Sequence, residues 1–198
     1  NPEVLNRFPA LADAAGHIAG PQLRNSGTIG GNLCLDTRCT YYNQTAFWRE
    51  ALGYCLKKDG DVCHVIRVGK KCVAAHSADT PPVLMTLDAV ATLVGPDGQR
   101  SVPVRDFFVA DGIVNSRRAP DEIVTELRIP LASAERKQAY AKLRVRKSID
   151  FPLLTVAIAA DLDGDGTVRS IEGVVTALGS RPHVPTGRWS LVPFYSPL

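Results

Sequence analysis

All five cysteines of this 198-residue chain lie in one stretch, and none occurs elsewhere. They are Cys34, Cys39, Cys55, Cys63 and Cys72. The number is odd, and the N-terminal Asn1-Pro2-Glu3 lacks the charged and apolar regions of a signal peptide. Both features argue against a disulfide framework, so the clustered thiols suggest a metal site. A metal site would organise this stretch around its ligands rather than around helices or strands.

The spacing Cys34-x4-Cys39-x15-Cys55-x7-Cys63-x8-Cys72 contains no C-x-x-C pair. A zinc knuckle or ribbon is therefore disfavoured, and the run of a two-cluster ferredoxin is absent. Four thiolates on long loops suit a cubane iron–sulfur cluster, with zinc and unligated core cysteines as the alternatives. Aromatic residues between Cys39 and Cys55 are expected to shield such a cluster from water.

Charge and hydropathy exclude several classes of protein. Lys and Arg (23) exceed Asp and Glu (20) by only three, and the basic residues are scattered, so nucleic acid is a poor candidate partner. No apolar run approaches the ~20 residues that span a bilayer. The sequence predicts a cytoplasmic protein that contacts no membrane.

Periodicity and turn residues predict an α+β fold. The expected elements are a helical region over 3–15, a polar glycine-rich loop over 22–33, an insertion over 34–75, a helix from about 79 to 89, a hairpin of strands 89–94 and 101–104, a strand over 122–130, and an antiparallel block over 137–178.

Asp161 to Glu172 satisfies the calcium-loop pattern of an EF-hand. An EF-hand needs a flanking helix on each side, but residues 154–160 are β-branched and alternating. Asp-Gly pairs also favour tight turns, because glycine tolerates positive φ. We therefore predict a β-hairpin at this position and no calcium site.

The segment Thr28-Ile29-Gly30-Gly31-Asn32 has neither Rossmann nor P-loop spacing. Adjacent glycines let a backbone approach an anion closely, and Thr28 and Asn32 add hydrogen-bonding side chains. A dinucleotide pyrophosphate would fit such a loop. The alternative is an ordinary loop with two glycines at tight turns.

Residues 22–33 closely resemble the second FAD-binding loop of the molybdenum hydroxylase flavoproteins, the medium-subunit family of xanthine dehydrogenase and carbon monoxide dehydrogenase. The resemblance continues through residues 77–84 and 122–130 and through Lys142, Arg146 and Asp150, and covers positions 5 to about 187.

This resemblance implies roles for individual residues. Thr28, Ile29, Gly30, Gly31 and Asn32 would hold the FAD pyrophosphate and its neighbouring groups. Asp79 would bind toward the ribose, and Val124 would pack on the adenine or the ring system. Lys142 would approach the flavin from a strand position where a core residue is expected, with a solvated strand face as the alternative. No catalytic residue is expected on this chain.

The cysteine insertion resembles one branch of the family, the flavin subunits of 4-hydroxybenzoyl-CoA reductase. In that branch an insertion carries an extra [4Fe-4S] cluster, and Cys39, Cys55, Cys63 and Cys72 match its ligands in spacing. Cys34 would remain unligated.

The resemblance implies an electron-transfer subunit. A ferredoxin would feed the [4Fe-4S] cluster, then FAD, then [2Fe-2S] centres on a small subunit and molybdenum on a large subunit, where 4-hydroxybenzoyl-CoA is reductively dehydroxylated. The alternatives are the FAD subunit of another molybdenum hydroxylase, of the xanthine or aldehyde dehydrogenase type, and a non-catalytic zinc-binding module.

The implied fold is the second subdomain of a PCMH-type FAD-binding domain over 1–133, with the [4Fe-4S] insertion at 34–75. An incomplete C-terminal α+β domain, similar to that of the carbon monoxide dehydrogenase flavoprotein, would follow over 134–187, and residues 188–198 form an atypical tail. The family's first glycine-rich FAD loop has no counterpart here, so we expect an N-terminally truncated fragment that retains FAD weakly or not at all.

Overall fold

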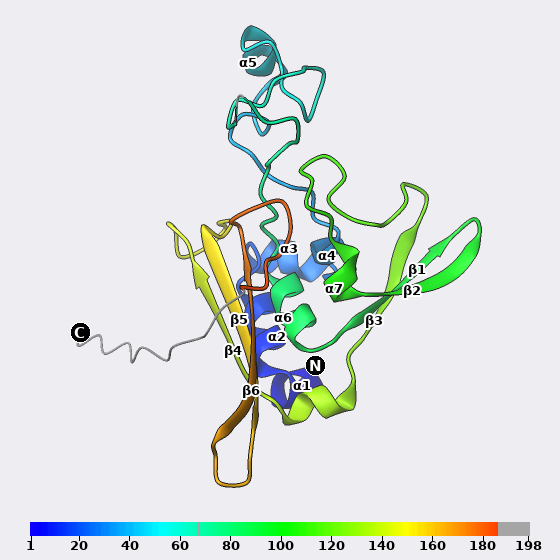
Figure 1. The fold of residues 1–198 in the computed structure, drawn as a ribbon, viewed down its shortest axis with the longest axis vertical. Coiled ribbons are helices and arrows are strands. Elements are labelled where there is room, and N and C mark those ends of the chain that lie inside the picture. The colour runs from blue at the N-terminus through cyan, green and yellow to red at the C-terminus, as the bar shows by residue number, and fades with distance from the viewer. Residues whose placement is uncertain (67, 186–198) are drawn as a thin grey trace, which may run out of the picture.

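The computed structural model describes residues 1–66 and 68–185, and the predicted tail 188–198 lies outside them. The described chain forms two antiparallel three-stranded sheets, with strand orders β2-β1-β3 and β4-β5-β6. Figure 1 shows helices α2 and α6 between the two sheets. The strands are β1 (Val90–Gly95), β2 (Gly98–Pro103), β3 (Ile123–Arg128), β4 (Lys137–Leu143), β5 (Leu154–Leu162) and β6 (Val168–Thr176).

The helices are short. They are α1 (Pro2–Arg7), α2 (Pro9–Gly16), α3 (Pro21–Ser26), α4 (Ile29–Leu33), α5 (Ala46–Ala51), α6 (Thr80–Thr86) and α7 (Val104–Phe107), with a 3-10 turn at η1 (Leu131–Glu135). None of the described helices is long and apolar enough to cross a membrane.

The α+β class and both predicted hairpins are confirmed. Strands β1 and β2 pair around a turn in which Gly98 has φ +106°, a conformation that favours glycine. Strands β5 and β6 form a hairpin through the turn at Asp163 to Thr167, where Gly166 has φ +85°. The calcium-like pattern therefore lies between two strands.

In the N-terminal segment the predicted helical region is confirmed, although it is broken into two helices, and the predicted loop is wrong. The helical region at 3–15 divides at Phe8, which has ψ +59°, because the residue before a proline is disfavoured in the α conformation and Pro9 begins a new helix. The expected loop at 22–33 contains helices α3 and α4 instead. Both are under two turns long, so their apolar residues show no helical period in the sequence.

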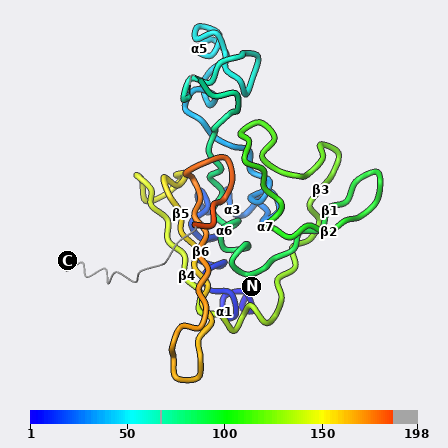
Figure 2. Tube along the Cα trace, in the orientation of Figure 1, coloured from blue at the N-terminus to red at the C-terminus, as the bar shows by residue number. Residues whose placement is uncertain are grey.

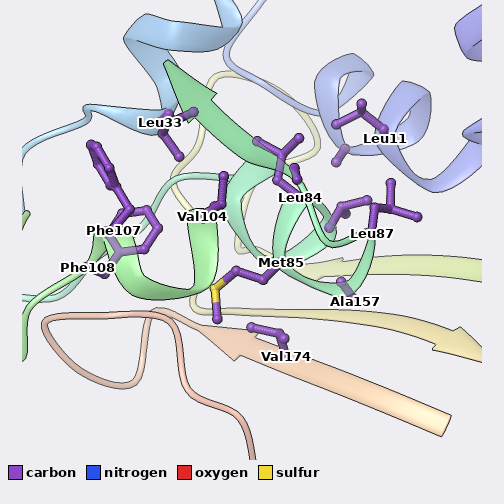
Figure 3. Close-up of a cluster of buried hydrophobic side chains, with 14 of the residues drawn as sticks. Leu11, Leu33, Leu84, Met85, Leu87, Val104, Phe107, Phe108, Ala157 and Val174 are labelled. Atoms are coloured by element: carbon purple, nitrogen blue, oxygen red, sulfur yellow. The ribbon is translucent and has the colours of Figure 1, made fainter. Parts of the chain in front are cut away.

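The core is centred on α6, whose seven residues are all buried. This helix contacts β5, β6, α2, α4 and α7. Figure 3 shows Leu84 of α6 and Leu87, which directly follows α6, among side chains from α2, α7, β5 and β6. Burial on all sides fixes α6 in place, and with it the polar residues that immediately precede it.

Residues 34–75 leave this core as a separate lobe, which Figures 1 and 2 show projecting beyond both sheets and carrying α5 at its far end. The two chain segments that connect the lobe to the core pair with each other at its base. Arg38 and Ala75 exchange two backbone hydrogen bonds of 2.8 Å each. The lobe is thereby closed at its base.

His76, at the base of the lobe, makes stability depend on pH. Its ring is fully buried at 4.6 Å from the Phe108 ring, with no hydrogen-bond partner for either nitrogen among the described residues. Burial lowers the pKa of His76 from 6.5 to about 4. The unfolded chain therefore binds a proton that the folded chain excludes, so this contribution to stability is complete above pH 6.5 and is lost as pH falls toward 4.

We expect wild type to lose about 2 kcal/mol of unfolding free energy between pH 7 and pH 5 through this residue. His76→Leu should not show that loss in urea unfolding, whereas His183→Leu, at an exposed histidine, should keep it. Equal pH dependence in wild type and His76→Leu would contradict this account.

Candidate cofactor sites

The predicted pyrophosphate loop is the start of α4. Thr28 is its N-cap, and the Thr28 Oγ1 accepts a hydrogen bond from the Gly31 N–H at 2.9 Å. The Asn32 side chain binds the start of α6. Its Oδ1 accepts a hydrogen bond from the Thr80 N–H at 3.0 Å and another from the Thr80 hydroxyl at 2.7 Å. Asn32 thus joins this loop to the first turn of α6.

Gly30 of α4 lies against Val124 of β3, with room for an ordinary contact. A Cβ atom at Gly30 would lie 3.5 Å from both Val124 Cγ1 and the Val124 carbonyl oxygen. Val124 is half-buried and packs against the core. The structure therefore places the predicted adenine contact directly behind the glycine loop.

A cavity of about 350 Å³, the glycine-loop cavity, opens beside α4. It is lined by Ala15, Ile18, Leu23, Arg24, Gly27, Thr28, Ile29, Gly31, Asn32, Leu35 and Thr80. Arg24 is the only charged residue among these described lining residues, and its guanidinium donates to the Ile18 carbonyl at 2.6 Å. The sequence reasoning missed Arg24, although a cation four residues before Thr28 could have indicated an anion subsite.

Asp79 and Lys142 form a buried ion pair. The Lys142 Nζ lies 2.9 Å from Asp79 Oδ1, and the two side chains are only 1% and 7% exposed, respectively. Lys142 also donates to the His17 carbonyl at 3.0 Å. The alternative of a solvated strand face for Lys142 is wrong, because its side chain is buried against Asp79 and the His17 carbonyl.

Tyr140 completes this group, and its hydroxyl donates to Asp79 Oδ1 at 2.7 Å. Burial raises the pKa of Asp79, and the hydrogen bonds from Lys142 and Tyr140 oppose that rise. Burial and the Asp79 charge together raise the pKa of Tyr140. Sequence reasoning missed Tyr140, although its i, i+2 spacing from Lys142 puts both on one face of a strand.

Four of the five cysteines line one small cavity in the lobe, the cysteine cavity. Its lining residues are Cys39, Tyr41, Tyr42, Cys55, Leu56, Lys57, Cys63, His64, Val65, Cys72 and Ala74. Cys34 is absent from this set and packs against the main core. The structure thus separates the cysteines into the predicted four and one.

All five cysteines are free thiols. Within residues 1–66 and 68–185, no three side chains of His, Cys, Asp or Glu stand close enough together to hold a metal ion. The cavity, about 20 Å³, has room for roughly one water molecule. The lobe therefore brings the four thiols to the wall of one cavity, but their sulfur atoms are not arranged around a single metal ion.

The cavity wall combines apolar and cationic groups. Burial raises the pKa of Cys72, and the positive charge of Lys57 offsets part of that rise. Tyr41 and Tyr42 line the cavity as the expected shield. Phe47, Trp48 and Tyr54, expected to join them, do not line the cavity, and Phe47 is 82% exposed on α5.

The turn that carries Cys55 is tightly constrained. Tyr54 and Asp59 have φ of +61° and +62°. A Cβ atom at Gly60 would lie 2.7 Å from the Cys55 backbone nitrogen, so only glycine fits there. Non-glycine residues rarely adopt positive φ, and a turn holding two of them stores backbone strain beside Cys55.

A larger cavity of about 460 Å³ adjoins the cysteine cavity and shares Cys39, Tyr41, Val65 and Ala74 with it. It extends to Ser77, which is buried and whose hydroxyl has no partner among the described residues. Ser77 lies two residues before Asp79. The lobe and the start of α6 therefore face a common space.

Residues 1–132 match the family model described as "FAD binding domain in molybdopterin dehydrogenase". The chain is 33% identical to the aldehyde oxidoreductase FAD-binding subunit PaoB of Escherichia coli K12, over 92% of this chain and 55% of that protein. It is 27% identical to the nicotinate dehydrogenase FAD-subunit of Eubacterium barkeri, over 84% of this chain and 44% of that protein.

Among solved structures, the chain is similar to a carbon monoxide dehydrogenase of Hydrogenophaga pseudoflava, with a TM-score of 0.65 and 28% identity. This similarity covers 93% of the chain and 50% of that structure's chain. The chain spans about half the length of the curated relatives that it matches.

Proposed function

Because the chain belongs to the family of FAD-binding domains in molybdopterin dehydrogenases, we propose that it exchanges electrons between FAD and an iron–sulfur cluster held in its own lobe. The observation that carries the proposal is the grouping of Cys39, Cys55, Cys63 and Cys72 around one cavity that excludes Cys34. Four thiols match the donor set of a [4Fe-4S] cluster, and no carboxylate lines this wall among the described residues.

The glycine-loop cavity fits the pyrophosphate half of FAD. Thr28, Ile29, Gly31 and Asn32 line it, and Arg24 adds a positive charge that suits a diphosphate. Asn32 holds α4 against Thr80, which keeps this wall next to Asp79.

FAD, when bound, supplies exchange of either one or two electrons. The chain's residues contribute binding and electrostatics. Lys142 is a buried cation whose charge favours electron-rich groups nearby, and Asp79 holds its ammonium in one position. Tyr140 in turn fixes the Asp79 carboxylate. Asp79, Val124 and Lys142 remain proposed FAD contacts.

The chain's proposed partners are a large subunit with the molybdenum cofactor and a small subunit with [2Fe-2S] clusters. In the reductive form of the proposal, a ferredoxin is the electron donor and the large subunit dehydroxylates 4-hydroxybenzoyl-CoA. The second candidate is aldehyde oxidation, which the similarity to the Escherichia coli aldehyde oxidoreductase subunit favours. In both forms the substrate reacts on another subunit.

The two forms are separated by assaying the purified complex of this chain with its co-expressed partner subunits. The reductive form predicts dehydroxylation of 4-hydroxybenzoyl-CoA with reduced ferredoxin. The oxidative form predicts reduction of a dye by an aromatic aldehyde. Activity in only one assay rejects the other form.

Gly31→Ala tests the FAD contact. The added Cβ would lie 3.1 Å from Thr28 Oγ1, so the Thr28 side chain would have to shift. Both residues line the glycine-loop cavity. We expect the FAD Kd to rise about tenfold or more, equivalent to ~1.4 kcal/mol, in equilibrium dialysis. Gly16→Ala is the matched control, because its Cβ would meet nothing within 4 Å. Equal affinities in all three proteins would contradict the assignment.

A further inference from the structure

Lys57 is a buried cation in the wall of the cysteine cavity. Its side chain is only 5% exposed, although lysine is among the residues least often buried. The Nζ lies 2.7 Å from Asp36 Oδ1, 2.9 Å from the Gly112 carbonyl oxygen and 3.1 Å from the Thr37 carbonyl oxygen. The ammonium also lies 4.8 Å from the centre of the Tyr42 ring, another wall residue.

These contacts hold the charge in place without cancelling it. Three of the four acceptors are neutral, namely the carbonyl oxygens of Thr37 and Gly112 and the Thr37 hydroxyl, which accepts at 2.5 Å. The fourth, the Asp36 carboxylate, is 59% exposed, so water weakens its negative charge without removing it. Lys57 faces the cavity from the buried side, where screening is weak. The next residue, Lys58, is 55% exposed and pairs with Asp59 outside the cavity wall.

A cluster held by four thiolates carries net negative charge, and each added electron makes it more negative. Net charge, hydrogen bonds and solvent exposure set the reduction potential of such clusters. A fixed positive charge beside the cluster favours the form with the extra electron.

We infer that Lys57 is a positioning residue that raises the reduction potential of the cluster in the cysteine cavity. The inference rests on the proposed function, since it requires a cluster at these four cysteines. A purely structural role for Lys57 is the competing explanation: through Thr37 and Gly112, Lys57 also ties the lobe to the loop that precedes β3. The potential separates the two roles, because a structural role changes cluster occupancy and leaves the potential unmoved.

The test is a dithionite titration, with redox mediators, of the full chain reconstituted anaerobically with iron and sulfide. One electron passes from dithionite to each cluster, and the reduced fraction is followed by electron paramagnetic resonance. We expect Lys57→Met to lower the reduced-to-oxidised ratio at a fixed potential about tenfold, a 59 mV fall for a one-electron couple. Lys57→Arg, which keeps the charge, should restore the wild-type ratio to within about threefold, or under ~30 mV.

Two further variants control for the fold and the sign. Lys58→Met removes a neighbouring exposed charge and should leave the ratio unchanged. Asp36→Asn keeps the acceptor oxygen for Lys57 but removes the negative charge, so it should shift the ratio in the opposite direction to Lys57→Met.

The outcomes are distinct. A wild-type chain that assembles no cluster overturns the proposed function itself. A full cluster with an unchanged ratio in Lys57→Met overturns only the role of Lys57. If Lys57→Met fails to assemble its cluster, Asp36→Asn decides: a raised ratio supports the inference, and an unchanged ratio overturns it.

Discussion

Replacing Cys63 with serine is expected to reduce bound iron from about four atoms per chain to less than about one, with loss of the broad absorbance near ~400 nm. Cys63 is only 6% exposed and lines the cysteine cavity with the three other proposed ligands. Thiolate is the form that binds metal, and a serine hydroxyl does not ionise at neutral pH. Iron and sulfide analysis after anaerobic reconstitution measures the effect.

Cys34→Ser is the matched control for this prediction. The chemical change is the same, but Cys34 lies outside the cysteine cavity and packs against the main core. We expect this variant to bind as much iron as the wild type. The four-cysteine assignment is rejected if Cys34→Ser loses its iron, or if Cys63→Ser keeps it.

The second large effect is expected from Lys142→Met, which should lower the unfolding free energy by about 3–5 kcal/mol at neutral pH. The side chains of Lys142 and Asp79 are only 1% and 7% exposed, respectively. Removing Lys142 therefore leaves the Asp79 carboxylate buried without its paired ammonium. Urea unfolding measures the loss. Lys137→Met, at an exposed position of the same strand, should change stability by less than about 0.5 kcal/mol.

The pH dependence of this effect has a fixed sign. Burial already raises the pKa of Asp79, and loss of Lys142 removes a group that opposes the rise. The folded Lys142→Met variant therefore takes up a proton on Asp79 more readily than its unfolded chain does. Its deficit relative to wild type should shrink as the pH falls toward the raised pKa.

Asp79→Asn in the Lys142→Met background tests the same point at neutral pH. Asparagine keeps an oxygen for the Tyr140 hydroxyl and carries no charge. The double variant should recover part of the lost stability. A double variant less stable than Lys142→Met would show that the uncompensated charge is not the cause.

Strands and turns were predictable because their signals are local. Alternation in residues 89–94, followed by Asp97-Gly98, indicates a hairpin in the sequence alone, and β1 and β2 form it. Flanking strands likewise distinguished the Asp161 hairpin from an EF-hand. The helices at Pro21 and Ile29 were missed because so short a helix depends on its cap and on tertiary contacts.

The candidate sites depend on contacts between residues distant in sequence. Lys142 and Asp79 are 63 positions apart, and only the fold, which brings β4 to the residue that caps α6, buries them together. Asn32 resembles a pyrophosphate ligand in the sequence, yet in the fold it holds Thr80, 48 residues later. The resemblance indicated which four cysteines belong together, but no local signal pointed to Lys57 among them.

The most direct test of the central claim is the iron, sulfide and zinc content of the wild-type chain after anaerobic reconstitution with FAD present. The proposed function predicts about four iron and four sulfide per chain. A colourless protein that holds about one zinc and no sulfide would contradict it and would favour a zinc-binding module.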